Sequence, residues 1–181
     1  MIEIRWHGRG GQGVVTVSRI LAIAAILEGK YAQAIPQFGP ERRGAPVLGY
    51  TRISDEPIDV HCGVYTCDAV VVIDPTVMGK HVLEGLKEGG PIFINTKRTP
   101  DEVKGRYSIK NPVYTVDATK IALDIFRKPY FNTPMLGALV RVLKLVKLES
   151  LEKALMLRFP EKIAKLNMEA IKRAYEEVKG V

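Results

Sequence analysis

The chain has 181 residues, of which 46% are hydrophobic and 26% are charged, and its formal net charge is +7. These proportions are typical of a globular protein and exclude a disordered chain, and the length predicts one domain that spans residues 1–181. The basic residues are scattered and form no run interleaved with aromatic residues, so charge alone does not predict nucleic-acid binding.

The sequence also predicts where the protein works. No apolar run approaches the ~20 residues that a membrane span needs. The first residues, 1–5, read as a strand and not as a basic and apolar leader. We therefore expect a cytoplasmic protein that binds neither a membrane nor nucleic acid.

The first predicted elements are a strand, a glycine-rich turn and a helix. Apolar and polar residues alternate over residues 2–7, and apolar residues recur at helical spacing over residues 14–28. The glycines between them match the spacing G-x-G-x-x-G at Gly8, Gly10 and Gly13. Such a turn allows close approach of a ligand, and the helix that follows directs unpaired N–H groups at it, a geometry that favours phosphate.

Two interpretations of this turn stay open. It either cradles a phosphate, or it needs glycine only to pack a strand tightly against a helix. A dinucleotide site further requires an acidic residue after the second strand. The second predicted strand, residues 31–35, runs into Pro36-Gln37-Phe38 with no carboxylate. The NAD-binding hypothesis therefore lacks its most diagnostic residue.

A stiff loop follows the second strand. Residues 36–46 contain three prolines and two glycines, which disfavour both helix and strand. The loop carries Arg42 and Arg43. Because this loop and Arg9 both follow strand ends, we expect the three guanidinium groups to lie near the glycine turn, where they would contact a phosphate, a carboxylate or a partner. The alternative is a basic loop that faces solvent.

The rest of the chain predicts an α/β fold with a mixed sheet and a helical carboxyl end. Residues 47–53 and 58–62 read as an antiparallel hairpin. The continuous apolar run 69–73 reads as a parallel strand covered on both faces. Asp74 follows it, either as a helix cap or as a ligand contact. Later strands are expected at residues 91–94 and 113–116, and helices at 77–86, 118–126 capped by Asp117, 135–146 capped by Thr133, 151–158 capped by Ser150, and along a last apolar face from Ile163 to Val178.

Motifs of a freestanding enzyme are missing. The sequence has no H-E-x-x-H, no G-x-S-x-G and no P-loop, and His7, His61 and His81 are isolated from one another. Cys62 and Cys67 are too few for an iron–sulfur cluster or a structural zinc site, so we interpret them as small apolar residues near the core.

The first strand points to an assembly. Glu3, Arg5 and His7 give it one polar face, which is unusual for a central strand. We expect this face to border either solvent or another subunit. The chain then reads as a component of something larger.

Several motifs together resemble the gamma subunit of 2-oxoacid:ferredoxin oxidoreductases. They are residues 7–13 (HGRGGQG), 29–34 (GKYAQA), 38–46 (FGPERRGAP), 71–75 (VVIDP), 95–96 (NT), 116–119 (VDAT) and 132–138 (NTPMLGA). The likeness preserves their order and spacing from the first strand to about residue 150. The resemblance implies a three-layer Rossmann-like domain with a mostly parallel sheet.

The resemblance also implies a function. Such enzymes convert a 2-oxo acid, here pyruvate and/or 2-ketoisovalerate, and coenzyme A into acyl-CoA and carbon dioxide, and they reduce ferredoxin. Thiamine diphosphate with Mg²⁺ lies between the alpha and beta subunits, and [4Fe–4S] clusters lie in the beta and delta subunits. The gamma chain is expected to bind no cofactor alone, to supply no catalytic residue and no metal ligand, and to partner the alpha, beta and delta subunits.

From this resemblance we expect one patch that contacts either the phosphates of coenzyme A or a neighbouring subunit. Its residues are Arg9, Gly10, Gly11, Gln12, Gly13, Arg42 and Arg43. Two rival hypotheses remain. A freestanding Rossmann-type nucleotide-binding oxidoreductase would turn over alone, and a basic nucleic-acid-binding domain would bind with a steep salt dependence.

Overall fold

The computed structural model describes residues 1–37, 44–60 and 62–180. Within these residues the strands form a six-stranded sheet in the order β2-β3-β1-β4-β5-β6. The strands are β1 (Ile2–Arg9), β2 (Tyr31–Gln37), β3 (Pro46–Ser54), β4 (Ala69–Val72), β5 (Ile92–Asn95) and β6 (Val113–Val116). The helices are α1 (Val14–Leu27), the 3-10 helix η1 (Pro75–Val77), α2 (Lys80–Leu83), α3 (Pro100–Tyr107), α4 (Ala118–Phe126), α5 (Asn132–Leu143), α6 (Leu148–Arg158) and α7 (Glu161–Glu177).

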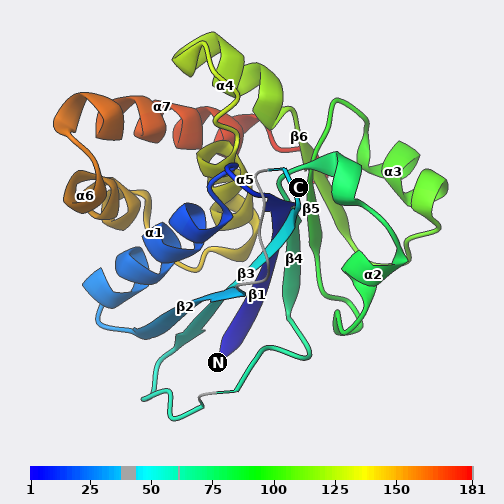
Figure 1. Ribbon diagram of the computed structural model, residues 1–181, viewed down its shortest axis with the longest axis horizontal. Helices are drawn as coiled ribbons and strands as arrows, with labels where there is room; N and C mark the ends of the chain where they lie inside the picture. Colours follow the sequence, from blue (N-terminus) through cyan, green and yellow to red (C-terminus); the bar gives the residue numbers. More distant parts are fainter. Residues whose placement is uncertain (38–43, 61, 181) are drawn as a thin grey trace.

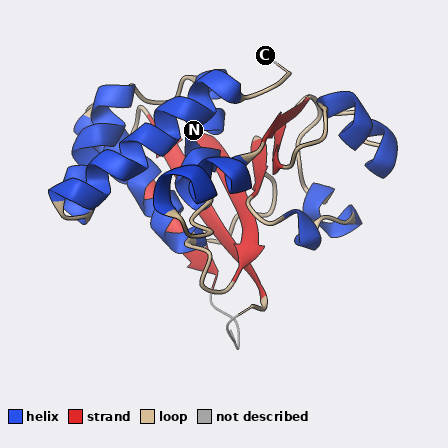
Figure 2. Cartoon of the chain, turned by 90° about the horizontal axis from the view of Figure 1, so that it is seen from above, coloured by secondary structure: helices blue, strands red, loops and turns tan. Residues whose placement is uncertain are grey.

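The sheet is the middle of three layers, as predicted. Helices α1 and α4 to α7 cover one face, and η1, α2 and α3 cover the other (Figures 1 and 2). None of the helices in the described ranges is long and apolar enough to cross a membrane. Strands β1, β4, β5 and β6 are parallel, whereas β3 runs antiparallel to both of its neighbours, β1 and β2. The prediction of a mixed, mostly parallel sheet is confirmed.

The predicted hairpin between residues 47–53 and 58–62 is wrong. Both edges of β3 are already paired, so the following segment cannot join it, and residues 57–60 are not in a strand. Arg52 holds this segment instead, donating hydrogen bonds to the carbonyls of Val60 (3.3 Å) and Gly63 (3.2 Å). The guanidinium is 1% exposed, and its charge is balanced by Glu3, whose Oε1 lies 2.7 Å from Arg52 Nε.

The polar face of β1 borders neither solvent nor another subunit at Arg5 and His7, because other residues of this chain cover it. Arg5 and His7 are 7% and 4% exposed. Arg5 Nη2 donates to the carbonyls of Val82 (2.8 Å) and Glu84 (2.6 Å), and Arg5 Nε donates to His7 Nε2 (3.0 Å). Both carbonyls lie at the carboxyl end of α2, where helices leave such groups unsatisfied. The prediction of an open polar face is therefore wrong.

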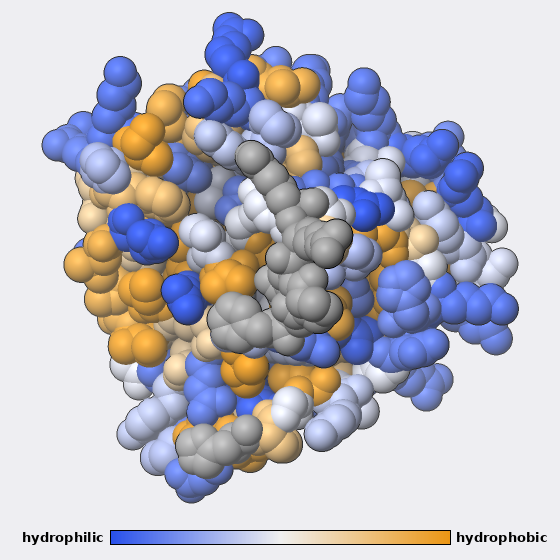
Figure 3. Space-filling view, in the orientation of Figure 1, coloured by the Kyte–Doolittle hydropathy of each residue, from blue (hydrophilic) through white to orange (hydrophobic). Residues whose placement is uncertain are grey.

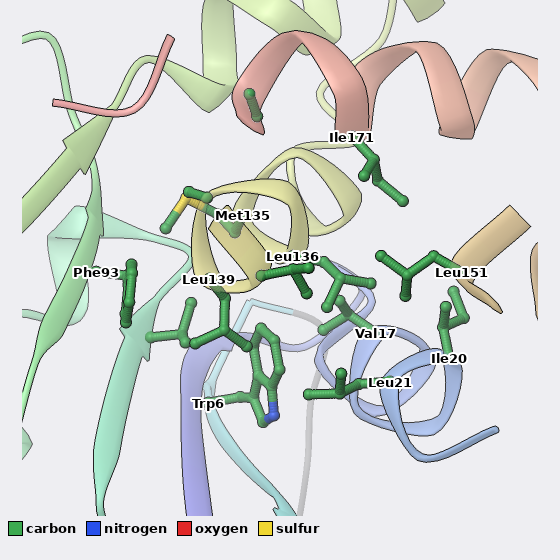
Figure 4. Close-up of a cluster of buried hydrophobic side chains, with 14 of the residues drawn as sticks. Trp6, Val17, Ile20, Leu21, Phe93, Met135, Leu136, Leu139, Leu151 and Ile171 are labelled. Carbon is green, nitrogen blue, oxygen red and sulfur yellow. The ribbon is translucent and has the colours of Figure 1, made fainter. Parts of the chain in front are cut away.

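The opposite face of β1 anchors the larger core. Trp6 is fully buried, and Figure 4 shows it against Leu139 of α5 and Leu21 of α1. Its indole Nε1 donates to Thr51 Oγ1 at 3.0 Å, so the one polar atom of the ring is satisfied. Helices α5 and α7 pack closely at Gly137, where an added Cβ would lie 2.2 Å from the carbonyl oxygen of Ile171.

Some predicted helix starts are confirmed and others are wrong. Asp117 caps α4 through a hydrogen bond from Lys120 N, and α4 has the predicted bounds. The predicted helix 77–86 is two short helices, η1 and α2. Thr133 lies inside α5, where its buried hydroxyl bonds Asn167. Helix α6 begins at Leu148, before Ser150.

The start of α6 is held by a distant residue. Glu28, just beyond α1, accepts a hydrogen bond of 2.6 Å from the backbone N–H of Lys147. Burial raises the pKa of Glu28. This hydrogen bond and one from Ser150 lower the pKa and outweigh the effect of burial, so it lies below the ordinary value. A carboxylate at a helix start is stabilising because it satisfies free N–H groups.

We predict that Gly137→Ala destabilises the chain by at least about 2 kcal/mol, because the methyl group would overlap backbone atoms of α7. The matched control is Gly105→Ala in α3, where an added Cβ meets nothing within 4 Å. This control should raise the free energy of unfolding by about 0.5–1 kcal/mol. Urea unfolding of the isolated chain measures both, and a Gly137→Ala variant as stable as the parent would contradict the packing.

We also predict a pH-dependent loss of stability from His7. Burial, with the nearby charge of Arg5, lowers the pKa of His7 from 6.5 to about 3. The folded chain therefore keeps His7 neutral, whereas the unfolded chain binds a proton as the pH falls below 6.5. The contribution is fully present above pH 6.5 and is lost towards pH 3.

Between about pH 7 and about pH 5, the free energy of unfolding should fall by about 2 kcal/mol more in the parent than in His7→Gln. Denaturant titrations at the two pH values measure the difference. Equal losses in the two proteins would show that His7 accepts a proton in the folded state.

Candidate functional site

The candidate site lies at the carboxyl ends of the neighbouring parallel strands β1 and β4 (Figure 1). Helix α1 follows β1 onto one face of the sheet, and η1 follows β4 onto the other. In open α/β sheets ligands bind outside the strand ends at such a switch point. The glycine turn, residues 10–13, lies at this point.

The turn leaves the start of α1 open. Gly11 and Gly13 have φ values of 90° and 77°, which L residues rarely adopt. Gly13 is the N-cap residue of α1, no side chain of the described residues caps this helix, and its first turn has no acidic residue. Among the described residues, the first N–H groups of α1 and the positive end of its dipole are therefore left to attract an anion.

A shallow cavity of about 320 Å³ covers this helix start. Its lining residues are Arg9, Gly10, Gly11, Gly13, Val14, Val15, Thr16 and Val47. It thus brings together four of the seven residues predicted for the patch. Gln12 points away from the cavity to bond Asp74, and Arg42 and Arg43 lie outside the described residues.

Arg9 is the cationic residue among the described residues that line this cavity. Its guanidinium is fixed by two hydrogen bonds, from Nε to Thr76 Oγ1 (2.9 Å) and from Nη1 to the carbonyl of Gly44 (3.0 Å). Nε also lies 3.6 Å from Asp74 Oδ2, and the side chain of Arg9 is 33% exposed. Arg9 therefore joins η1 to the end of the proline-rich loop and still reaches solvent.

Asp74 connects η1 to the glycine turn. Its Oδ1 accepts hydrogen bonds from the backbone N–H (2.9 Å) and hydroxyl (2.6 Å) of Thr76, which confirms the predicted cap. Its Oδ2 accepts a hydrogen bond of 2.6 Å from Gln12 Nε2. Burial raises the pKa of Asp74, but the hydrogen bonds from Thr76 and Gln12 and the charge of Arg9 lower it below the ordinary value. The carboxylate is therefore ionised at neutral pH.

Two asparagines at this edge were not predicted as site residues. Asn132, at the start of α5, donates from Nδ2 to the carbonyl of Gly13 at 3.3 Å. Asn95, at the end of β5, donates to the carbonyl of Ile73 and to Thr119 Oγ1, both at 3.0 Å. Both belong to motifs that carry the family resemblance, residues 95–96 and 132–138, but their partners are distant in sequence, so the motifs alone do not indicate these contacts.

The described residues of the cavity offer groups that bind an anion, namely backbone N–H groups and the guanidinium of Arg9. The residues that line the cavity include no histidine, cysteine or carboxylate, the groups that most often act as acid, base or nucleophile. His7, which follows Trp6 in β1, is buried beneath α2 on the other face of the sheet. Across the described ranges, no three His, Cys, Asp or Glu side chains are grouped closely enough to hold a metal ion.

The two cysteines differ. Cys67 is buried, as predicted, and burial raises the pKa of its thiol. Cys62 is exposed, so the prediction that it lies near the core is wrong. It belongs to the segment that Arg52 holds against the sheet by its carbonyl groups, which leaves side chains of that segment free to face outward.

Comparison with known proteins identifies relatives of this chain. The family model of pyruvate ferredoxin/flavodoxin oxidoreductase matches residues 3–177. The chain is 49% identical to the pyruvate/ketoisovalerate oxidoreductases common subunit gamma of Thermococcus litoralis, over 98% of this chain and 97% of the relative. The crystal structure of pyruvate oxidoreductase subunit PORC from Thermotoga maritima matches with 44% sequence identity and a TM-score of 0.88, over 98% of this chain and 97% of that chain. The gamma subunit of a keto/oxoacid ferredoxin oxidoreductase from Geobacter sulfurreducens matches with 29% identity and a TM-score of 0.78 over 98% of each chain.

We predict that Gly13→Ala disrupts the start of α1. An added Cβ would lie 2.4 Å from Asn132 Nδ2, at a φ that already disfavours alanine. The expected loss in the free energy of unfolding is about 2–3 kcal/mol. Gly29→Ala is the control, because its φ is 80° but nothing lies within 4 Å of the added atom. It should cost only about 1 kcal/mol.

Adding Asn132→Ala to Gly13→Ala should recover part of the lost stability, because it removes the atoms that clash. Chemical denaturation of the four proteins measures these differences. Equal losses for Gly13→Ala and Gly29→Ala would refute the contact between the glycine turn and α5.

Proposed function

The chain belongs to the pyruvate ferredoxin/flavodoxin oxidoreductase family, and we propose that it is the gamma subunit of a multi-subunit 2-oxoacid:ferredoxin oxidoreductase. This enzyme converts pyruvate and/or 2-ketoisovalerate, with coenzyme A and oxidised ferredoxin, into acyl-CoA, carbon dioxide and reduced ferredoxin. One observation carries the proposal. The chain matches separate gamma subunits from end to end, with 98% of its own length and 97% of theirs covered.

The proposal assigns the redox chemistry to the partner chains. Thiamine diphosphate and Mg²⁺ belong to the alpha and beta subunits, and the [4Fe–4S] clusters belong to the beta and delta subunits. The sequence of this chain supports that division. It has two cysteines, fewer than the four that a [4Fe–4S] cluster needs, and it lacks the G-D-G motif by which such enzymes bind thiamine diphosphate. The complex is cytoplasmic, and this chain forms one part of it without activity of its own.

The role of this chain within the complex is to position coenzyme A. Its ligand patch consists of Arg9, Gly10, Gly11, Gln12, Gly13, Arg42 and Arg43. Support comes from the start of α1, which no described side chain caps, from the cavity above it and from the guanidinium of Arg9 at its rim. The phosphates of coenzyme A are the anions that backbone N–H groups and arginines hold best. The same patch also suits contact with an acidic segment of a neighbouring subunit.

An apolar surface supports assembly into a larger complex. Helix α1 carries a single charged residue, Arg19, and leaves Ile26 54% and Leu27 45% exposed. Leu157 of α6 is 70% exposed. Figure 3 shows the orange area that spreads over the side of α1 and α6. Exposed apolar patches of this kind are typical of subunit contacts.

The freestanding oxidoreductase is not favoured. Strand β2 ends at Gln37 and carries no carboxylate along its length, so the ribose contact of a dinucleotide site is missing at this strand. The nucleic-acid hypothesis rests on net charge alone.

We predict that Arg42→Ala/Arg43→Ala raises the KM of the assembled enzyme for coenzyme A or releases this chain from the complex. Each lost bond between a guanidinium and a phosphate is expected to weaken binding about tenfold or more. The measurements are steady-state kinetics with coenzyme A varied and size-exclusion chromatography of the complex. Lys162→Ala/Lys172→Ala on the exposed side of α7 removes the same charge as a control. If the arginine variant matches this control in both assays, the patch has neither role.

A further inference from the structure

Asp74 does more than cap a short helix. Its side chain is 13% exposed, and the carboxylate lies between the glycine turn and η1. We propose that Asp74 is a positioning residue for the coenzyme A site: through Gln12 and Thr76 it holds the glycine turn and the Arg9 guanidinium in the arrangement that accepts a phosphate. This inference rests on the function proposed above and adds to it two residues, Asp74 and Thr76, that do not themselves line the cavity.

The first arm runs through Gln12. The side-chain amide of Gln12 donates to Asp74 Oδ2 at 2.6 Å, which leaves its oxygen to accept from the backbone N–H of Arg9 at 2.7 Å. The carboxylate accepts hydrogen bonds only, so it fixes which end of the amide faces each partner. The side chain of Gln12 thus links the start of the glycine turn, at Arg9, to Asp74. These two hydrogen bonds fix the shape of the turn.

The second arm runs through Thr76. The Thr76 hydroxyl donates to Asp74 Oδ1 at 2.6 Å and accepts from Arg9 Nε at 2.9 Å. One hydroxyl thus connects the carboxylate to the guanidinium. Within the described residues, the guanidinium uses Nε and Nη1 for its bonds to Thr76 and Gly44, and Nη2 bonds neither of them. A guanidinium that is held before the ligand arrives loses less conformational entropy on binding.

A comparison within the chain separates this role from capping. Asp117 also follows a parallel strand at the same edge of the sheet and also caps a helix, accepting from Lys120 N at 2.9 Å. Capping uses one carboxylate oxygen in both residues. Asp74 directs its second oxygen to a residue 62 positions away, in the turn at the cavity. Asp117 therefore serves as a matched control.

The test uses the assembled enzyme with Asp74→Asn, Thr76→Val, Arg9→Ala or Asp117→Asn. An amide at position 74 places N–H groups opposite the Gln12 N–H groups, and the valine removes the hydroxyl that joins Asp74 to Arg9. Both variants, like Arg9→Ala, should raise the KM for coenzyme A about tenfold and leave kcat and the KM for the 2-oxo acid unchanged. Asp117→Asn should change none of these constants.

A second variant keeps the proposal testable if Asp74→Asn prevents assembly. In Gln12→Glu/Asp74→Asn, the amide at position 74 donates to the carboxylate at position 12, so the hydrogen bond between the two positions is restored in the opposite direction. The other oxygen of that carboxylate still accepts from the N–H of Arg9. It should assemble and recover most of the affinity for coenzyme A.

The outcomes distinguish the two claims. If Arg9→Ala raises the KM for coenzyme A but Asp74→Asn and Thr76→Val do not, the positioning role is overturned and the proposed function stands. If all three leave that KM unchanged, the coenzyme A site itself is wrong. A fall in kcat, or an equal rise in the KM for the 2-oxo acid, would show that Asp74 serves only the general structure. A double variant no better than Asp74→Asn would overturn the arm through Gln12.

Discussion

The candidate site depends on where β1 ends. β1 pairs with β3 along one edge and β4 along the other, so the turn that follows it is placed between two fixed neighbours. Backbone bonds extend this pairing into the turn, since Gly10 N donates to the carbonyl of Ala45 at 2.8 Å. Burial of Trp6 on one face and Arg5 on the other fixes the register of the strand. The start of α1, and the cavity above it, follow from that register.

Local sequence patterns predicted the strand, turn and helix at the start of the chain, the buried strand β4 and the cap at Asp117. They failed where distant contacts decide the outcome. Residues 58–62 resemble a strand, but both edges of β3 are occupied. Thr133 resembles a cap, but its hydroxyl bonds Asn167 of α7. Helix α3 is a local exception: it was not predicted, although Thr99 and Glu102 form a capping box and Pro100 occupies the first helical position.

The candidate site was predicted in part. Arg9, Gly10, Gly11 and Gly13 lie together because they are neighbours in sequence. The second role of Asp74 was not predictable, since its partner Gln12 is 62 positions away, and Asn132 lies 119 positions from Gly13. Family membership adds what geometry alone cannot, because a cavity with glycines and one arginine suits many anions.

The most direct test is a structure of the assembled oxidoreductase with coenzyme A bound. The account predicts a phosphate of coenzyme A within hydrogen-bond distance, about 3 Å, of Arg9 and of the first N–H groups of α1. Coenzyme A held entirely by other subunits, with this cavity facing solvent, would contradict it.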